Sequence, residues 1–417
     1  MGETESGVTE AQHPAADVPA PRQQPLPLAG YRVISSEQYG AGPYGTMFLA
    51  QLGAEVIKIE PPKGGDSARA AGPYFLGQDD SLFYQTFNLN KRSLTLDLRT
   101  DAGREVLHRL VATADAVTNN ARGDLPAKLG LDYAALGRIN PAIVCVHASA
   151  YGRDGPRASW PGYDYLMQAE AGFMAVTGAP DDPPTRFGLS LVDFMTGSML
   201  ATATLAALIG ARASGQGCDY DLSLLDAALH QTSYPAMWYL NEGFETGRAP
   251  RSAHPSVTPS QTFRTADGWV FVMAQLPKFW TLLVDLIGAE GLKDDPRFAT
   301  VAARLENRDA LTVALDAIFQ RQPTRHWTGL LGGIVPVAPV YGLGEALDNP
   351  EVAGMIDRVA HPDLPAGMRV LTSPIRVAGQ RLPNRAAPKL GADTEALLAE
   401  VGYDADAIAS LRERGVV

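Results

Sequence analysis

Several features that mark other classes of protein are scarce in this chain of 417 residues. Basic residues are outnumbered, 35 against 46 acids, and the net charge of −11 argues against a general binder of nucleic acid or anionic membrane. A small anionic ligand needs only a local group of cations and remains compatible with this charge. No apolar run reaches the length of about 18 residues that a membrane-spanning helix requires. The longest, MTGSMLATATLAALIGA (195–211), is rich in small residues, which favours a helix inside a globular core.

Cysteine is also rare, and no metal-ligand spacing is present, so we expect no metal site. Cys145 and Cys218 each lie in an apolar or strand-like run, and we expect two reduced core residues rather than a disulfide. The N-terminus lacks a basic segment followed by an apolar run, the pattern of a signal peptide. We therefore expect a cytoplasmic protein.

The sequence pattern divides the chain into four parts. Residues 1–28 hold proline, acids and small residues with almost no large apolar ones, which predicts a disordered tail. Over residues 29–245 apolar strands alternate with helices, which predicts a large α/β domain with a Rossmann-like parallel sheet. Residues 246–334 contain a polar loop, a hairpin-like pair of runs and two helical stretches, which predict a smaller α+β domain. Residues 335–417 return to short strands and proline turns, and we expect this segment to rejoin the large domain.

The stretch GAGPYG (Gly40–Gly45) has the spacing of the dinucleotide-binding motif G-x-G-x-x-G and lies between a predicted strand and a predicted helix. Glu60 ends the next strand, about twenty residues later, where a ribose-binding acid would stand. Two details weaken the NAD interpretation. Residues 37–39 separate the strand from the first glycine, where the motif has a tight turn, and Pro43 occupies a variable position. We favour a small-residue loop that does not bind nicotinamide, with an NAD-dependent dehydrogenase as an alternative.

A family resemblance covers the chain from Leu28 to the C-terminus. Its matching segments include LAQLGAEVIKIEPPKGGD, FNLNKRSLTLDLRTDAGREVLHRLVATADAV, KLGLDYAALGRINPAIVCVHASAYGRDGP, PGYDYLMQAEAG and LVDFMTGSMLATATLAALIGARASGQGCDYDLSLLDA. Together they resemble the class III CoA-transferases, the family of formyl-CoA transferase and carnitine CoA-transferase, to which the α-methylacyl-CoA racemases are related. The resemblance implies a CoA-transferase that moves CoA from an acyl-CoA to a carboxylic acid. It also implies an interlocked homodimer and no tightly bound cofactor, with coenzyme A as co-substrate.

The resemblance places the family's nucleophilic aspartate at Asp193, in LVDFMTG, and a second, supporting acid at Asp164, in PGYDY. The residues agree with the first role, because Asp193 precedes a helix predicted to begin at Thr196, and a helix N-terminus stabilises a carboxylate. The same position also suits a simple helix-capping aspartate, and Asp164 could be a surface turn acid. Gly40 replaces a glutamine of formyl-CoA transferase. We expect it in a substrate loop, and we expect a substrate pair other than formyl-CoA and oxalate.

The resemblance also implies which residues bind CoA: Tyr163, Lys63, Leu96, Arg99, Asn120, Ala121, Arg122 and Lys128. The cations among them suit contacts with phosphates, although each could equally be a solvated surface residue. Tyr163 favours a transferase, because the racemases carry a histidine at this position and a tyrosine is a poor base at neutral pH. An α-methylacyl-CoA racemase and an inactive acyl-CoA-binding protein remain as alternatives.

Overall fold

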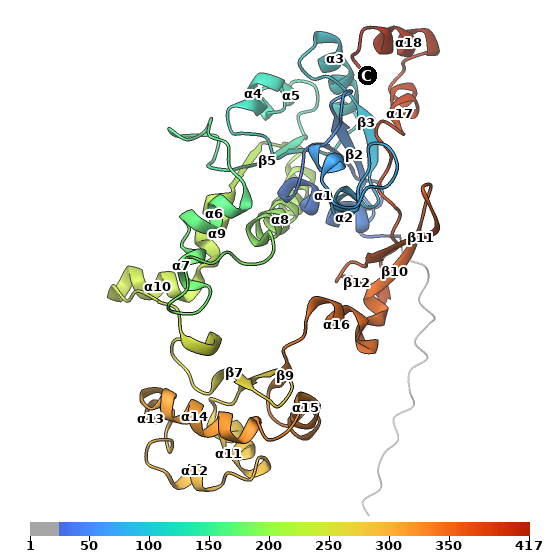
Figure 1. The fold of residues 1–417 in the computed structure, drawn as a ribbon. Coiled ribbons are helices and arrows are strands. Elements are labelled where there is room, and N and C mark those ends of the chain that lie inside the picture. Colours follow the sequence, from blue (N-terminus) through green and yellow to red (C-terminus); the bar gives the residue numbers. More distant parts are fainter. Residues whose placement is uncertain (1–24) are drawn as a thin grey trace, which may run out of the picture.

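A computed structural model of the protein describes residues 25–417 (Figure 1). Its centre is a six-stranded parallel sheet in the order β3-β2-β1-β4-β5-β6, as in doubly wound nucleotide-binding folds. The strands are β1 (Arg32–Ser36), β2 (Glu55–Glu60), β3 (Arg92–Thr95), β4 (Ala116–Asn119), β5 (Val144–Ser149) and β6 (Asp219–Ser223). The predicted parallel α/β sheet is confirmed.

Helices α1 (Ala41–Gln51) and α8 (Leu191–Ser214) pack on one face of this sheet, through a core that includes Val33 and Val144. In the described part of the chain, α8 alone is long and apolar enough to cross a membrane by length and composition. It nevertheless contacts α1, β5 and α9 (Leu224–Gln231), so it serves as a central helix of the folded domain.

The opposite face of the sheet is covered by α3 (Asp101–Val111) together with the C-terminal helices α17 (Thr394–Glu400) and α18 (Ala405–Glu413). These helices share one buried cluster with strand residues such as Ile34 and Ile57. The end of the chain therefore packs on the sheet formed by its beginning. The remaining helices of this part are η1 (Ser67–Ala70), α2 (Leu82–Asn88), α4 (Leu125–Leu129), α5 (Tyr133–Leu136), α6 (Asp164–Glu170), α7 (Phe173–Val176) and α10 (Ser233–Glu242).

A smaller unit lies apart from the large sheet in Figure 1 and is joined to it by two connecting segments. It has its own core and a three-stranded antiparallel sheet, in which β8 lies between β7 and β9. Its elements are η2 (Pro250–Ser252), β7 (Ser260–Arg264), β8 (Trp269–Met273), α11 (Pro277–Leu286), α12 (Gly291–Asp294), α13 (Val301–Glu306), α14 (Arg308–Phe319), α15 (Thr324–Leu331) and β9 (Val337–Pro339). The elements between β9 and α17 are α16 (Leu343–Asp348), η3 (Pro350–Met355), β10 (Ile356–His361), β11 (Leu364–Leu371), β12 (Arg376–Val377) and β13 (Gln380–Arg381).

Three sequence expectations differ from the structure in detail. Strand β9 pairs with β8, so the sheet of the small unit extends past the predicted boundary at 334. The predicted tail lies outside the described residues as far as residue 24, but Leu28 is buried against the sheet, so residues 25–28 do not belong to a tail. Cys145 is buried as expected, whereas Cys218 is exposed because it directly precedes β6, the edge strand.

Candidate active site

The predicted site residues gather at one edge of the parallel sheet. Gly40 follows β1, Lys63 follows β2, Arg99 follows β3, and Asn120 follows β4. The carboxyl ends of parallel strands meet at the same edge, and this is where ligands bind in open α/β sheets. The topology thus brings together residues that are far apart in the sequence.

Small residues let α1 and α8 approach closely at this edge. A Cβ added at Gly45 would lie 2.5 Å from the carbonyl oxygen of Gly197, and one added at Gly197 would lie 2.6 Å from that of Ala41. The N-terminal ends of the two helices therefore meet, and Gly40 lies against Asp193. A Cβ at Gly40 would be 2.2 Å from Asp193 Oδ2. The glycines of GAGPYG thus permit close packing of helices and loop, which accounts for their spacing without a dinucleotide.

Asp193 and Asp164 form a buried pair at the ends of two helices. Asp193 is the third residue of α8 and Asp164 the first of α6, and they are 9% and 4% exposed. The backbone N–H of Asp193 donates to Asp164 Oδ2 at 2.9 Å. The prediction that α8 begins at Thr196 is wrong by five residues, because it begins at Leu191. Asp193 also does not cap the helix, since the N-cap position is Ser190, which makes no side-chain capping bond.

The surroundings of the pair favour the protonated form of Asp193. Burial, together with the nearby charge of Asp164, raises the pKa of Asp193 to about 7. Burial also raises the pKa of Asp164, although hydrogen bonds from the backbone of Asp193 and the side chain of Gln168 oppose this effect. A carboxylate with a pKa near neutrality is a candidate for chemistry rather than for a structural ion pair.

The loop that carries Gly40 is held on both sides. The Asn120 side chain accepts a hydrogen bond from Gln38 N–H at 2.9 Å and donates one to Gln38 C=O at 2.7 Å. Asp66 Oδ1 accepts a hydrogen bond from Tyr39 N–H at 3.0 Å. Tyr39 has a φ of 67°, in the left-handed region that non-glycine residues rarely adopt. These bonds fix an unfavourable backbone conformation next to the Asp193 carboxylate.

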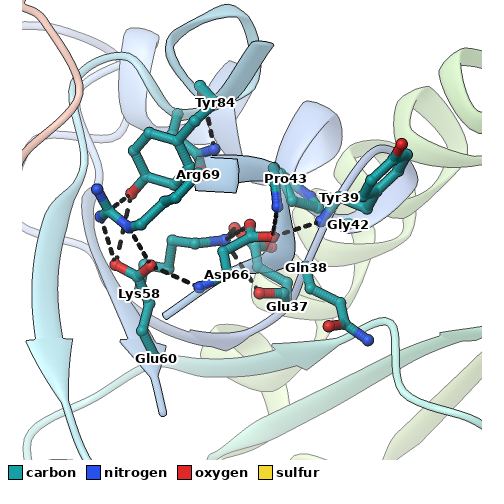
Figure 2. A network of polar contacts seen from close by, with 12 residues as sticks. Glu37, Gln38, Tyr39, Gly42, Pro43, Lys58, Glu60, Asp66, Arg69 and Tyr84 are labelled. Atoms are coloured by element: carbon teal, nitrogen blue, oxygen red, sulfur yellow. Dashed lines mark hydrogen bonds and ion pairs between the residues drawn. The ribbon is translucent and has the colours of Figure 1, made fainter. Parts of the chain in front are cut away.

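A buried charge network supports this loop from below (Figure 2). Lys58 Nζ lies 2.8 Å from Asp66 Oδ2 and donates to Glu37 C=O at 3.0 Å, while Lys91 Nζ donates to Glu37 Oε1 at 2.6 Å. Burial would lower the pKa of Lys58, but the carboxylates of Asp66 and Glu37 outweigh it and raise the pKa above its ordinary value. Burial lowers the pKa of Lys91 to about 8. The network was not predicted from the sequence, although its residues surround the predicted loop.

Glu60, which the NAD interpretation assigns to a ribose, belongs to the same layer. Arg69 donates to both of its carboxylate oxygens at 2.7 Å, and Ser93 Oγ donates at 2.6 Å. Glu60 is fully buried in this arrangement. Its side chain is therefore not available to a ribose. The NAD alternative thus loses the ribose-binding acid, the second of the two features on which it rests.

The four predicted phosphate-binding cations are exposed near the same edge. The Arg99 side chain is 81% exposed and pairs with Asp97 at 2.8 Å. Arg122 and Lys128 both pair with Asp124, at 2.6 Å each, which holds the two cations side by side. They carry charge at the surface where a phosphate could reach them.

The other predicted CoA-binding residues differ in accessibility. Tyr163 is exposed and directly precedes α6, and Ala121 is half-buried. Leu96 lies in the core beneath the sheet, so its side chain is not accessible to a ligand and only its backbone could contribute a contact. Asn120 bonds the Gln38 loop, as described above. His147, in β5, is buried and bonds Asp219 at 2.8 Å.

Residues 28–394 match the family model described as CoA-transferase family III. The chain belongs to CoA-transferase family III. A similar protein is an acetyl-CoA:oxalate CoA-transferase from Acetobacter aceti, 34% identical, with 90% of this chain and 95% of the relative covered. A succinate–glutarate CoA-transferase from Agrobacterium fabrum is 34% identical, with 91% and 97% covered. As a member of this family the chain is an enzyme that transfers CoA.

Solved structures of the family have the same fold. A CaiB/BaiF family protein from Brucella suis superimposes with a TM-score of 0.79 at 34% identity, covering 91% of this chain and all of the other. Rv3272 from Mycobacterium tuberculosis gives a TM-score of 0.78 at 30% identity, covering 89% and 99%. The recognised family resemblance is therefore confirmed, whereas the roles of individual residues remain predictions.

Proposed function

We propose that this family III CoA-transferase uses the Asp193 carboxylate as a covalent carrier, with Asp164 as its supporting acid. The observation that supports the proposal is the environment of Asp193. Its carboxylate lies at the ligand edge of the sheet, against the backbone of Gly40, and accepts no hydrogen bond from the described residues. A pKa near 7 leaves it about half ionised at neutral pH and makes the ionised form a better nucleophile than an ordinary aspartate.

The chemistry balances without an external proton or redox partner. Asp193 Oδ attacks the thioester carbonyl of the acyl-CoA, which forms a mixed anhydride and releases the CoA thiolate. The thiolate attacks the aspartyl carbonyl, which forms an aspartyl–CoA thioester and releases the first acid as its carboxylate. An incoming carboxylate attacks the carbonyl of that thioester, which forms a second anhydride and breaks the C–S bond to release the CoA thiolate. The released thiolate then takes the new acyl group and regenerates Asp193.

For the substrates, we infer that one partner is a short dicarboxylic acid. Relatives of about one-third identity are named for oxalate, glutarate, D-citramalate and mesaconate, with acetyl-CoA or succinyl-CoA as donor in several names. The expectation of a substrate pair other than formyl-CoA and oxalate remains a prediction; one of these relatives is named for oxalate with acetyl-CoA. Lys63, Arg99, Arg122 and Lys128 would hold the CoA phosphates, and Tyr163, Asn120, Ala121 and the backbone of Leu96 would border the nucleotide.

We also propose an interlocked homodimer. Helix α10 contains no buried residue in the single chain. Two large apolar residues on it, Met237 and Leu240, are 60% and 74% exposed. Such large apolar side chains are costly to leave in water, and a second subunit would cover them. Interlocked rings cannot separate without unfolding. We expect the dimer mass to persist on dilution to nanomolar concentration in mass photometry, and monomers in a folded sample would contradict interlocking.

The catalytic proposal is tested by trapping. The protein is incubated with acetyl-CoA, succinyl-CoA and longer acyl-CoAs, hydroxylamine is added, and the modified peptide is mapped by mass spectrometry. We expect a hydroxamate on Asp193 with at least one donor, and none in the isosteric variant Asp193→Asn. An unmodified Asp193 in the presence of a bound acyl-CoA would contradict the carrier role. Exchange of the α-proton in deuterated water would then indicate the racemase alternative.

A further inference from the structure

Gln168 lies one turn after Asp164 on α6 and is completely buried. Its Oε1 accepts a hydrogen bond from Phe187 N–H at 2.9 Å. Its Nε2 donates to Leu189 C=O at 3.1 Å and to Asp164 Oδ1 at 2.6 Å. The side chain thus connects the supporting acid to the segment that leads into the nucleophile's helix.

These contacts determine which way the amide faces. A backbone N–H can only donate and a backbone C=O can only accept, so Oε1 must face Phe187 and Nε2 must face Leu189. Asp164 therefore meets donors at both oxygens: Gln168 Nε2 at Oδ1 and Asp193 N–H at Oδ2. Hydrogen bonds donated to a carboxylate favour its ionised form. Asp193, by contrast, accepts no hydrogen bond from the described residues.

We propose that Gln168 is a positioning residue that keeps Asp164 ionised and thereby assigns the titrating proton of the carboxylate pair to Asp193. The inference rests on the proposed function, because it presumes that Asp193 is the reacting group. In this arrangement the negative charge of Asp164 makes the Asp193 carboxylate more basic, which strengthens it as a nucleophile. The bonds to Phe187 and Leu189 also hold the segment that leads into α8. One amide therefore influences both the charge of Asp164 and the position of the segment before Asp193.

Few other charges act on the pair. Arg186, in the segment before α8, favours the ionised form of Asp164. Helix α7 contains no titratable residue, and Asp226 and His230 of α9 are exposed. From α1, Tyr44 packs on Phe194 beside the nucleophile, and burial raises the pKa of its phenol, so it is neutral at physiological pH. Gln168 is thus a neutral donor. Its replacement by another neutral residue can alter the protonation of the pair without adding or removing a neighbouring charge.

The test uses two variants of nearly equal size. Gln168→Met removes the donor to Asp164, so Asp164 should accept a proton more readily and the Asp193 titration should move to lower pH. Gln168→Glu retains an acceptor for Phe187 N–H and, when ionised, adds a negative charge beside Asp164, so the total negative charge near Asp193 increases and the Asp193 titration should move to higher pH. We expect displacements of about one pH unit, in opposite directions. A role confined to folding would lower stability without moving either titration.

The midpoint is read by infrared titration of the carboxyl band in the free enzyme, as a difference against Asp193→Asn. This readout needs no turnover, so it separates the inference from the proposed function, which fails instead if Asp193 is never trapped by hydroxylamine. Gln85 provides a matched control, because it is a buried glutamine that donates to Asp80 at 3.0 Å and accepts from Ala387 N–H at 2.8 Å. Gln85→Met should change the melting temperature but not the midpoint.

The outcomes are distinct. Opposite displacements in the two Gln168 variants, with trapping on Asp193 intact in wild type, support the proposal. Unchanged midpoints in folded Gln168→Met and Gln168→Glu overturn it, whatever the trapping result. If Gln168→Met does not fold, Gln168→Glu decides alone, because it retains the bond to Phe187: an unmoved or lowered midpoint in that variant overturns the proposal.

Discussion

Substitution of Gly40 by alanine should disable the enzyme while leaving it folded. The backbone of Gly40 has φ −107° and ψ −79°, which alanine adopts without the strain of a positive φ. The difficulty lies in the new Cβ, which would be 2.2 Å from Asp193 Oδ2 and 2.9 Å from its Cγ. Gly40 cannot retreat freely, because the preceding loop is bonded to Asn120 and Asp66. The Asp193 carboxylate must therefore move.

The size of the effect follows from the distance. Ordinary contact between a carbon and another heavy atom is about 3.5 Å, so the carboxylate must shift by roughly 1 Å. A misplacement of about 1 Å costs on the order of 100-fold in rate, or ~2.7 kcal/mol of transition-state stabilisation. The folded state should lose ~1–3 kcal/mol, as for other overpacked sites. We therefore expect kcat to fall about 100-fold with KM for the acyl-CoA little changed.

The assay follows thioester exchange from succinyl-CoA or acetyl-CoA to glutarate and oxalate, together with a melting curve. Gly329→Ala is the control, because Gly329 lies in α15 and its added Cβ would meet no described atom within 4 Å beyond its chain neighbours and the backbone of its own helix. That change should stabilise the helix by ~0.5–1 kcal/mol and leave kcat unchanged. A Gly40→Ala enzyme that retains kcat within twofold of wild type would refute the argument that position 40 confines the Asp193 carboxylate.

Three further changes test other parts of the structure. Lys58→Met leaves the buried Glu37 and Asp66 without their shared cation and should cost ~3–5 kcal/mol in urea unfolding; a loss below 1 kcal/mol would contradict the network's importance. The raised pKa of Asp193 means that wild type loses stability as pH rises from about 4 through about 7, so the melting temperature of Asp193→Asn should gain on wild type between pH 5 and pH 8. A constant difference would contradict the raised pKa. Arg122→Ala should raise KM for acyl-CoA about tenfold at unchanged kcat, and a selective fall in kcat would exclude a pure binding role.

The parallel sheet could be predicted because its strands are apolar runs separated by helices with one apolar face. In α3, for example, Val106, Leu107 and Leu110 recur at helical spacing and are all buried. The pairing of β8 with β9 could not be predicted, because β9 is three residues long and joins its partner across more than sixty intervening residues. A segment this short becomes a strand because it pairs with a neighbouring strand, and its own sequence does not indicate that neighbour.

The start of α8 shows why local signals failed at the site. The sequence LVD continues an apolar run and ends in aspartate, a residue type typical of a helix N-cap, so the sequence pattern places the helix start after Asp193. In the structure the N–H of Asp193 is satisfied by Asp164, from 29 residues earlier in the chain. The cap of this helix is therefore a tertiary contact. Sequence patterns describe neighbours along the chain and do not show which distant oxygen reaches a helix end.

Part of the charge network beneath the Gly40 loop could be predicted from the sequence of β2. Strand β2 reads EVIKIE and lies between β3 and β1, and after Glu55 at its start Lys58 and Glu60 occupy alternate positions among apolar residues. Alternate residues of a strand share one face, so both charges had to be buried on the same side of the sheet. Buried charges require partners, and the KGGD loop that follows supplies Asp66. The partner Glu37, in the loop after β1, was not readable from spacing alone.

The hydrogen bonds of the two aspartates differ in a way that agrees with their proposed roles. Both oxygens of Asp164 accept bonds, from Gln168 Nε2 and Asp193 N–H, so its lone pairs are engaged and its position is fixed. Asp193 has no such donors among the described residues, and it faces a glycine whose missing side chain leaves room beside the carboxylate. A donor at Asp193 would stabilise the ground-state anion and reduce its nucleophilicity, whereas a carboxylate held by donors is suited to support. The fold therefore gives Asp164 the surroundings that the proposed supporting acid requires and Asp193 the surroundings that the proposed nucleophile requires.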